Sequence, residues 1–213
     1  MATKQVTPDF ILVMDWETTG ADWDKDSHID YQGIAFGAIV AKADTFEAVD
    51  ELYCEIKFND KKWQWTDSAE KIHGLSREHL AEHGMSQEDA AAALLELILK
   101  YWGPDGKVMF LGHNPRFDIG FTRQLLNEVG VEFSDKRHAD PSAEVLIELH
   151  HVVLDSSALG FITTGLFKSD LLFEKMGFEK RGDHNALQDA HMTLGTCATI
   201  RALVEAGETV LNG

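Results

Sequence analysis

Basic residues are scarce in this chain, and their scarcity limits what the chain can bind. The 213 residues include 19 lysines and arginines against 36 aspartates and glutamates, which gives a formal net charge of −17. A surface of this sign repels nucleic acid and anionic membranes at long range. Proteins that coat duplex nucleic acid are basic, so this class is excluded. Any nucleic acid must be held at a local site, with bound cations, over a short stretch or an end.

Long apolar runs and cysteine pairs are also missing. The first apolar run, 10–14, meets an aspartate at once, so it resembles neither a signal peptide nor a membrane span. Cys54 and Cys197 lie far apart and form no CxxC pair, which suggests neither a disulfide framework nor a thiolate zinc site. We therefore expect no membrane association and a reducing, cytoplasmic location.

The order of apolar segments predicts a single α/β domain over residues 1–213, without linkers or repeats. We expect strands at 9–17, 32–41, 51–58, 108–114 and 147–155, and helices at 67–73, 87–102, 117–130, 168–177 and 186–207. Ser86 and Asp89 open the second helix at capping-box spacing. This order indicates a mixed central sheet flanked by helices, with an antiparallel meander first and βαβ crossovers after it.

Two carboxylates, Asp15 and Glu17, stand at the inner end of the first strand. Side chains two residues apart share a face of a strand, so both point the same way. Two unpaired negative charges held together near a core cost several kcal/mol, unless a cation neutralises them or one takes up a proton. The pair therefore predicts either a bound cation or a protonated acid.

Two later motifs carry further candidate ligands. Asp118, in GHNPRFD, stands at the start of a helix that follows a buried strand. In GDHNALQDA, His184 precedes a helix and Asp189 lies within it. Five residues turn a regular helix by roughly 140°, so these two cannot face one ion from one straight helix. We expect His184 on the preceding loop and Asp189 on the helix face packed against the sheet.

Four carboxylates and one imidazole suit two-metal phosphoryl chemistry, in which two divalent ions roughly 4 Å apart clamp the attacking and leaving oxygens. Oxygen ligands without thiolates favour Mg²⁺ or Mn²⁺ over zinc. A histidine with a pKa near neutral can take the proton from an attacking water.

The motifs DxETTG, HNxxFD and HNALxDA, in this order and at this spacing, resemble those of the DnaQ-like (DEDDh) 3′→5′ exonucleases. The resemblance covers nearly the whole chain, because IHGLS (72–76) and LDSSAL (154–159) also lie where members carry similar segments. It implies a ribonuclease-H-like three-layer fold. It also implies removal of nucleoside 5′-monophosphates from the 3′ ends of single strands.

The resemblance also implies residue roles. Asp15 would bridge two ions, Glu17 and Asp189 would complete the site that activates water, Asp118 would hold the leaving-group ion, and His184 would be the general base. Substrate-binding positions would be Thr18, Thr19, Gly20, His73, Gly74, Leu75, Asn114 and Phe117. Of these, the backbone of 18–20 would border the terminal nucleotide and 73–75 would lie near its base. Leu75 is either a wedge between bases or a core residue, and we expect Phe117 in the core.

Simpler interpretations of the same residues remain. Asp118 could merely stabilise its helix through the interaction of its charge with the helix dipole. His184 could be an ordinary loop residue. The chain could also be a non-catalytic nucleic-acid-binding or polymerase-binding module, although intact acids and an intact histidine argue against it. HLAEH (79–83) fits the H-x-x-E-H pattern of a zinc peptidase, but Gly84 cuts that segment short.

Local phosphate contacts are expected from a few basic residues: Lys57, Lys61, Arg116, Lys180 and Arg181. The chain stops soon after the last motif helix, which favours a free-standing trimming enzyme over a proofreading subunit. A polymerase or replication partner and a homodimer both stay open. No motif fixes contacts to the 2′ position, so DNA and RNA substrates are not separated.

Overall fold

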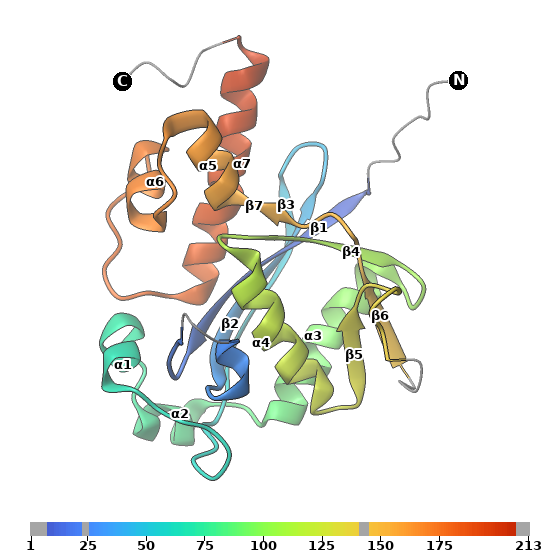
Figure 1. The fold of residues 1–213 in the computed structure, drawn as a ribbon, viewed down its shortest axis with the longest axis vertical. Coiled ribbons are helices and arrows are strands. Elements are labelled where there is room, and N and C mark those ends of the chain that lie inside the picture. The colour runs from blue at the N-terminus through green and yellow to red at the C-terminus, as the bar shows by residue number, and fades with distance from the viewer. Residues whose placement is uncertain (1–7, 23–25, 141–144, 208–213) are drawn as a thin grey trace.

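The computed structural model describes residues 8–22, 26–140 and 145–207. Its centre is a seven-stranded mixed sheet in the order β3-β2-β1-β4-β6-β5, with β7 beside β4 (Figure 1). The strands are β1 (Phe10–Thr18), β2 (Gly33–Lys42), β3 (Ala48–Glu55), β4 (Lys107–Gly112), β5 (Val131–Ser134), β6 (Val145–Leu149) and β7 (Leu154–Asp155). The β1–β2–β3 pairs are antiparallel and the other pairs are parallel. The predicted mixed sheet, with its meander first, is confirmed.

Side-chain caps define where several helices begin. The helices are a 3-10 turn η1 (Ser27–Ile29), α1 (Asp67–His73), α2 (Arg77–His83), α3 (Gln87–Trp102), α4 (Pro115–Asn127), α5 (Ser156–Thr164), α6 (Ser169–Lys175) and α7 (Ala186–Glu205). Ser86 accepts a hydrogen bond from the Asp89 N–H at the start of α3, as predicted, and the Asn185 side chain caps α7 in the same way. Within the described ranges, no helix is both long and apolar enough to cross a membrane.

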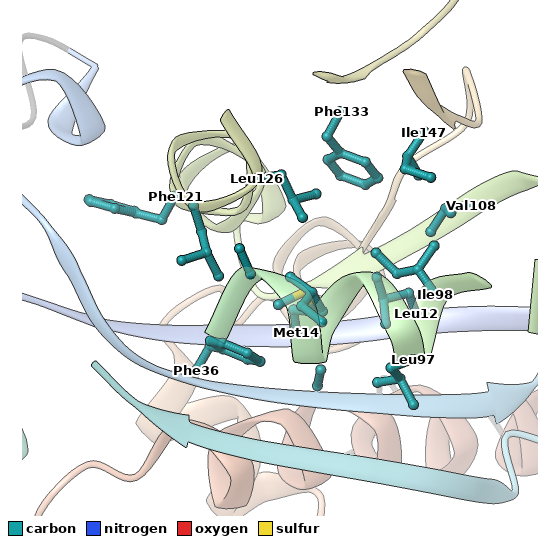
Figure 2. Packing of buried hydrophobic residues seen from close by; sticks show 14 of the residues in the cluster. Leu12, Met14, Phe36, Leu97, Ile98, Val108, Phe121, Leu126, Phe133 and Ile147 are labelled. Atoms are coloured by element: carbon teal, nitrogen blue, oxygen red, sulfur yellow. The ribbon is translucent and has the colours of Figure 1, made fainter. Parts of the chain in front are cut away.

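One face of the sheet is covered by α3 and α4. Leu12 and Met14 of β1 point to this face and pack with Phe36 of β2 and with side chains of both helices (Figure 2). The aromatic ring of Phe121 on α4 packs at one side of this cluster, and β3, β4, β5 and β6 also contribute side chains. This cluster is the larger of the two apolar cores, so the α3–α4 side fixes the position of β1.

The opposite face lies under α7. Ile11 and Val13 of β1 pack there against apolar side chains of α7. Because strand side chains alternate between faces, Asp15 and Glu17 continue this row. The two acids therefore point to the layer that contains α7, and the same helix carries Asp189 in its first turn.

A glycine lets α7 come close to the acidic end of β1. Gly37 of β2 pairs with Asp15 in the antiparallel register. A Cβ atom at Gly37 would lie 2.3 Å from the Cα of Leu187, so only glycine admits the backbone of α7 at this distance. Since Leu187 precedes Asp189 by two residues, the contact brings the Asp189 turn over the end of β1.

The third acid, Asp118, lies near the first two because β4, which precedes it, is parallel to β1. Carboxyl ends of parallel strands meet at one edge of a sheet, and ligands commonly bind there. After β4, Asn114 adopts a left-handed conformation with φ 62° and ψ 57°, which turns the chain directly into α4. Asp118 then lies in the first turn of α4.

Parts of the predicted element list are wrong. The single strand expected at 147–155 is two strands, because β6 pairs with β4 at Val108 and β7 pairs with it again only at Leu111. Between them, the ring of His150 accepts a hydrogen bond from the Val152 N–H, which bends the chain. The strand expected at 51–58 begins and ends earlier, as β3. The short elements α2, α5 and β5 were not predicted, since segments of four to nine residues show little periodicity.

Replacing Gly37 by alanine should destabilise the fold, because its Cβ would meet the backbone of α7. We expect the free energy of unfolding, measured in urea, to fall by roughly 1–3 kcal/mol. Gly182→Ala is the matched control, since nothing lies within 4 Å of its Cβ position. That variant should stay within about 1 kcal/mol of the wild type. Equal stability of the two variants would show that α7 does not need the close approach.

Candidate active site

A cavity of about 220 Å³ opens at the carboxyl ends of β1 and β4. It is lined by Asp15, Trp16, Glu17, His113, Asn114, Phe117, Asp118, Ser169, Phe173, Arg181, His184 and Asp189. The structure thus brings together all five residues predicted to be catalytic, from β1, α4, α7 and the loop before α7. The sequence did not single out Trp16, Ser169 and Phe173, because aromatic and small residues on apolar elements give no functional signal, and it gave no role to His113, which begins the HNxxFD motif.

The acids of this cavity are buried close to one another. Glu17, Asp118 and Asp189 are 6%, 2% and 3% exposed, and Asp15 is partly buried. Burial raises the pKa of each carboxyl group, and at Asp15 the charges of Asp118 and Asp189 raise it further. The pKa of Glu17 rises to about 7, mainly through burial and then through Asp189. Full ionisation of the group is therefore costly without a cation.

The donor set fits a divalent metal ion. Glu17, His184 and Asp189 each offer a ligand atom, and these atoms lie within 4.8 Å of one another. Glu17 Oε1 is buried and has no hydrogen-bond partner among the described residues. A buried carboxylate oxygen without a donor is rare in native structures, and carboxylate oxygens are preferred ligands of hard divalent cations.

His184 lies on the loop before α7, as predicted, and this loop is held from two sides. Its backbone N–H donates to the carbonyl oxygen of Ile72 over 3.0 Å. Its ring Nδ1 lies 3.4 Å from Asp189 Oδ2, and its side chain is 32% exposed. Burial and then the positive charge of Arg181 lower the pKa of His184. The imidazole is therefore neutral at neutral pH, as a base must be before it accepts a proton.

Arg181 also lines the cavity, and its side chain is largely buried there. It was predicted as a phosphate contact, but its side chain is only 7% exposed and its Nη1 donates to Asp189 Oδ2 over 2.6 Å. Its role as a phosphate contact stays a prediction, and its pairing with an acid of the cavity was not predicted. The other predicted phosphate contacts are exposed: Lys57, Lys61, Arg116 and Lys180. Of these, Arg116 pairs with Asp26 over 3.0 Å.

The turn after β1 is built by its threonines. Thr18 Oγ1 donates to the carbonyl oxygen of Gly20 over 3.0 Å, and Thr19 Oγ1 accepts from the N–H of Gln32 over 3.0 Å. All three residues of the turn are buried. Their side chains therefore shape the turn, which leaves the backbone of 18–20 as the part that could border a ligand.

The end of α1 lies beside the loop that carries His184. His73 is 5% exposed, its Nδ1 accepts the N–H of Leu75, and its Nε2 lacks a partner among the described residues. A Cβ at Gly74 would lie 3.4 Å from the carboxylate of Asp183, so the two segments touch. Leu75 is partly buried, in a position compatible with either of its two predicted roles.

The remaining predicted positions lie at the cavity itself. Asn114 is exposed there, and Phe117 is partly buried. The ring of Phe117 packs on Phe121 with centroids 4.9 Å apart, so Phe117 belongs to the edge of the core and also to the cavity wall.

The HLAEH segment does not form a metal centre in the described part of the chain. His79 Nε2 lies 2.6 Å from Glu55 Oε2, and α2 has only seven residues. Neither His79 nor His83 belongs to the group of side chains that could hold an ion.

Acidic residues of three sequence motifs thus converge at one edge of this sheet. The chain belongs to the RNase_T exonuclease family, whose family model matches residues 12–196. It is thus a DnaQ-like exonuclease domain with a ribonuclease-H-like fold. Exonucleases of this family depend on divalent metal ions, and the donor set around Glu17 agrees with that chemistry.

Solved structures of exonucleases share the fold. The zinc-ion-bound form of an E. coli ExoI complex with single-stranded DNA is 18% identical, with a TM-score of 0.69 over 92% of this chain and 41% of that one. E. coli exonuclease I with a dT13 oligonucleotide is also 18% identical, with a TM-score of 0.69 over 93% of this chain and 42% of that one. A 3′-exonuclease that recognises the 3′ end of a histone mRNA stem-loop is 16% identical, with a TM-score of 0.65 over 96% of this chain and 66% of that one. This chain therefore spans about two fifths of exonuclease I. No curated protein matches the sequence significantly.

Glu17→Gln should change stability in a pH-dependent way in metal-free protein. The pKa of Glu17 is about 7 in the fold against 4.5 as the ordinary value, so the fold binds the proton more tightly than the unfolded chain does. This stabilisation is present below about pH 4.5 and is lost as the pH rises through about 7. In EDTA we expect wild type and variant to match near pH 4.5, with the variant more stable by about 1–3 kcal/mol near pH 8.

Urea unfolding at the two pH values measures this difference. Added Mg²⁺ near pH 8 should reverse the order, because ligand binding to the folded wild type stabilises it. A difference between wild type and Glu17→Gln that stays constant with pH would mean that Glu17 is not a strained, buried acid.

Proposed function

We propose that this protein is a 3′→5′ exonuclease of the DEDDh type, which releases nucleoside 5′-monophosphates from single-stranded DNA or RNA ends. The observation that carries the proposal is the convergence of four carboxylates and one imidazole on a single cavity. All five side chains come from one chain, so the site needs no residue from a partner. Residues 1–213 act as one exonuclease domain in this proposal.

Two divalent cations, Mg²⁺ or Mn²⁺, would be held by Asp15, Glu17, Asp118 and Asp189. When bound, such ions lower the pKa of a coordinated water and stabilise charge on the attacking and leaving oxygens. Asp15 would be shared between the ions, since its charge interacts with both Asp118 and Asp189. Without the ions, a pKa of about 7 leaves Glu17 partly protonated near neutral pH.

His184 acts as the general base in this proposal. Its lowered pKa keeps the ring neutral near pH 7. Because Nδ1 faces Asp189 Oδ2, a proton on Nδ1 leaves Nε2 as the basic nitrogen. The hydrogen bond from the His184 backbone to Ile72 fixes the loop against α1, so the base keeps its place while its ring reaches the cavity.

The substrate is the end of a strand, because an acidic surface disfavours long contacts with nucleic acid and the cavity is small. The backbone of 18–20, the end of α1 at 73–75, Asn114 and Phe117 would surround the terminal nucleotide. Single-stranded DNA and an RNA stem-loop are what the structural neighbours bind, which supports a nucleic-acid end without choosing the sugar. The two buried, unpaired cysteines of the protein suit a reducing cytoplasm, where we place the enzyme.

The test uses single-stranded DNA and RNA oligonucleotides of one sequence, labelled at the 5′ end. With Mg²⁺ we expect a ladder that shortens from the 3′ end, absent in EDTA and with Asp15→Ala. The ladder also shows which sugar is preferred. If neither strand is cut with Mg²⁺ or Mn²⁺, the enzyme proposal is wrong and a binding module takes its place.

His184→Ala should lower the turnover number by roughly 10²–10⁴, the range typical of a lost general base. The KM for the oligonucleotide should change little, since the ring is not needed to hold the strand. His151→Ala, an exposed histidine outside the cavity, is the matched control and should keep full activity. A His184 variant with wild-type turnover near neutral pH would rule out the assigned base.

A further inference from the structure

The guanidinium of Arg181 is a buried cation inside an acidic cavity. Its Nη1 donates to Asp189 Oδ2 over 2.6 Å, its Nε donates to Asp170 Oδ1 over 2.8 Å, and its Nη2 donates to Ser169 Oγ over 2.8 Å. The plane also lies over the ring of Phe173, 5.3 Å from its centroid. Every nitrogen of the group is therefore engaged, and only 7% of the side chain is exposed.

These contacts join two helices across the loop that carries His184. Ser169 and Asp170 stand at the start of α6, and Asp189 stands in the first turn of α7. Arg181 lies on the connecting segment, three residues before His184. A planar fork of donors can hold two carboxylates and a hydroxyl in one geometry, whereas a lysine offers a single point charge.

The contacts at Asp189 leave part of its carboxylate available. Both the ion pair with Arg181 and the approach of His184 go to Oδ2. A carboxylate has two oxygens, so Oδ1 remains to bind a cation. Partners of this kind orient metal ligands in many proteins, and their loss typically costs 10- to 100-fold in metal affinity or activity.

We propose that Arg181 is a positioning residue, which holds Asp189 by Oδ2 so that Oδ1 is presented to a divalent ion, and which anchors the His184 loop to α6. The proposal rests on the exonuclease function above. It differs from the sequence-based role of Arg181 as a phosphate contact, because each nitrogen of this guanidinium already donates to a side chain of the protein.

The test measures Mn²⁺ binding by the 213-residue protein without nucleic acid, with free Mn²⁺ followed by electron paramagnetic resonance. Arg181→Gln should weaken the binding of one ion by about 10- to 100-fold. Arg181→Lys should lie between the wild type and Arg181→Gln, since it restores charge without the fork. Asp170→Asn should weaken binding less than Arg181→Gln, because it removes an anchor of the guanidinium and leaves Asp189 paired.

Arg201→Gln is the matched control, because Arg201 pairs with Glu205 on the exposed surface of α7. It should bind Mn²⁺ as the wild type does. In the nuclease assay at saturating Mn²⁺, Arg181→Gln should lower the turnover number and leave the KM for the oligonucleotide nearly unchanged. A lost phosphate contact would raise the KM instead.

The proposal is overturned if the Arg181→Gln variant binds Mn²⁺ as tightly as the wild type, since Arg181 then has no effect on the ion. It is also overturned if the variant binds Mn²⁺ more tightly, since Arg181 then competes with the ion. If this variant does not fold, Asp170→Asn decides, and unchanged Mn²⁺ binding by that variant overturns the proposal equally. Because binding is measured without nucleic acid, a failed nuclease assay with the wild type would affect only the proposed function.

Discussion

Repulsion between buried carboxylates is the constraint on which the rest of this structure depends. Asp15, Glu17, Asp118 and Asp189 converge where water is largely excluded, and burial raises the pKa of all four. Such a group is unstable as four free anions. The fold keeps it because cations offset the repulsion: Arg181 on one side, and divalent ions in the proposed active state. The folded chain holds these carboxylates together in spite of their repulsion. Binding of a metal ion removes this repulsion, so the folded site favours metal binding.

Strand pairing and helix packing place the acids at one edge of the sheet, more than contacts between side chains do. The parallel pairing of β1 and β4 brings Asp15 and the start of α4 to one edge of the sheet. The glycine at position 37 lets α7 lie directly against β2, which carries Asp189 to the same edge. Packing of the larger core against α3 and α4 then fixes β1 in place (Figure 2). The geometry of the site is therefore a consequence of strand pairing and of the close approach of α7. A substitution at Gly37 would displace the turn that carries Asp189, although Gly37 itself is no ligand.

How much the sequence could predict follows from how local each signal is. The shared face of Asp15 and Glu17 follows from the two-residue period of a strand, and the loop position of His184 follows from helix geometry, so both were predictable. The pairing of Arg181 with Asp189 was not, because it depends on how the start of α6 and the first turn of α7 lie relative to each other. The split between β6 and β7 likewise depends on which part of β4 each strand contacts. The backbone of the turn at 18–20 was predicted to border the substrate, whereas the hydrogen bond from the Gln32 N–H to Thr19 Oγ1 could not be predicted, because it is a tertiary contact.

Anomalous diffraction from crystals soaked in Mn²⁺ tests the central claim most directly, because it locates the ions without relying on turnover. The account predicts two peaks roughly 4 Å apart in the cavity, on either side of Asp15 and bounded by Glu17, Asp118 and Asp189. Crystals of Asp15→Ala should lose both peaks. Clear Mn²⁺ peaks elsewhere on the acidic surface, with none among these four carboxylates, would contradict the account and leave the buried acids without a cation to explain them.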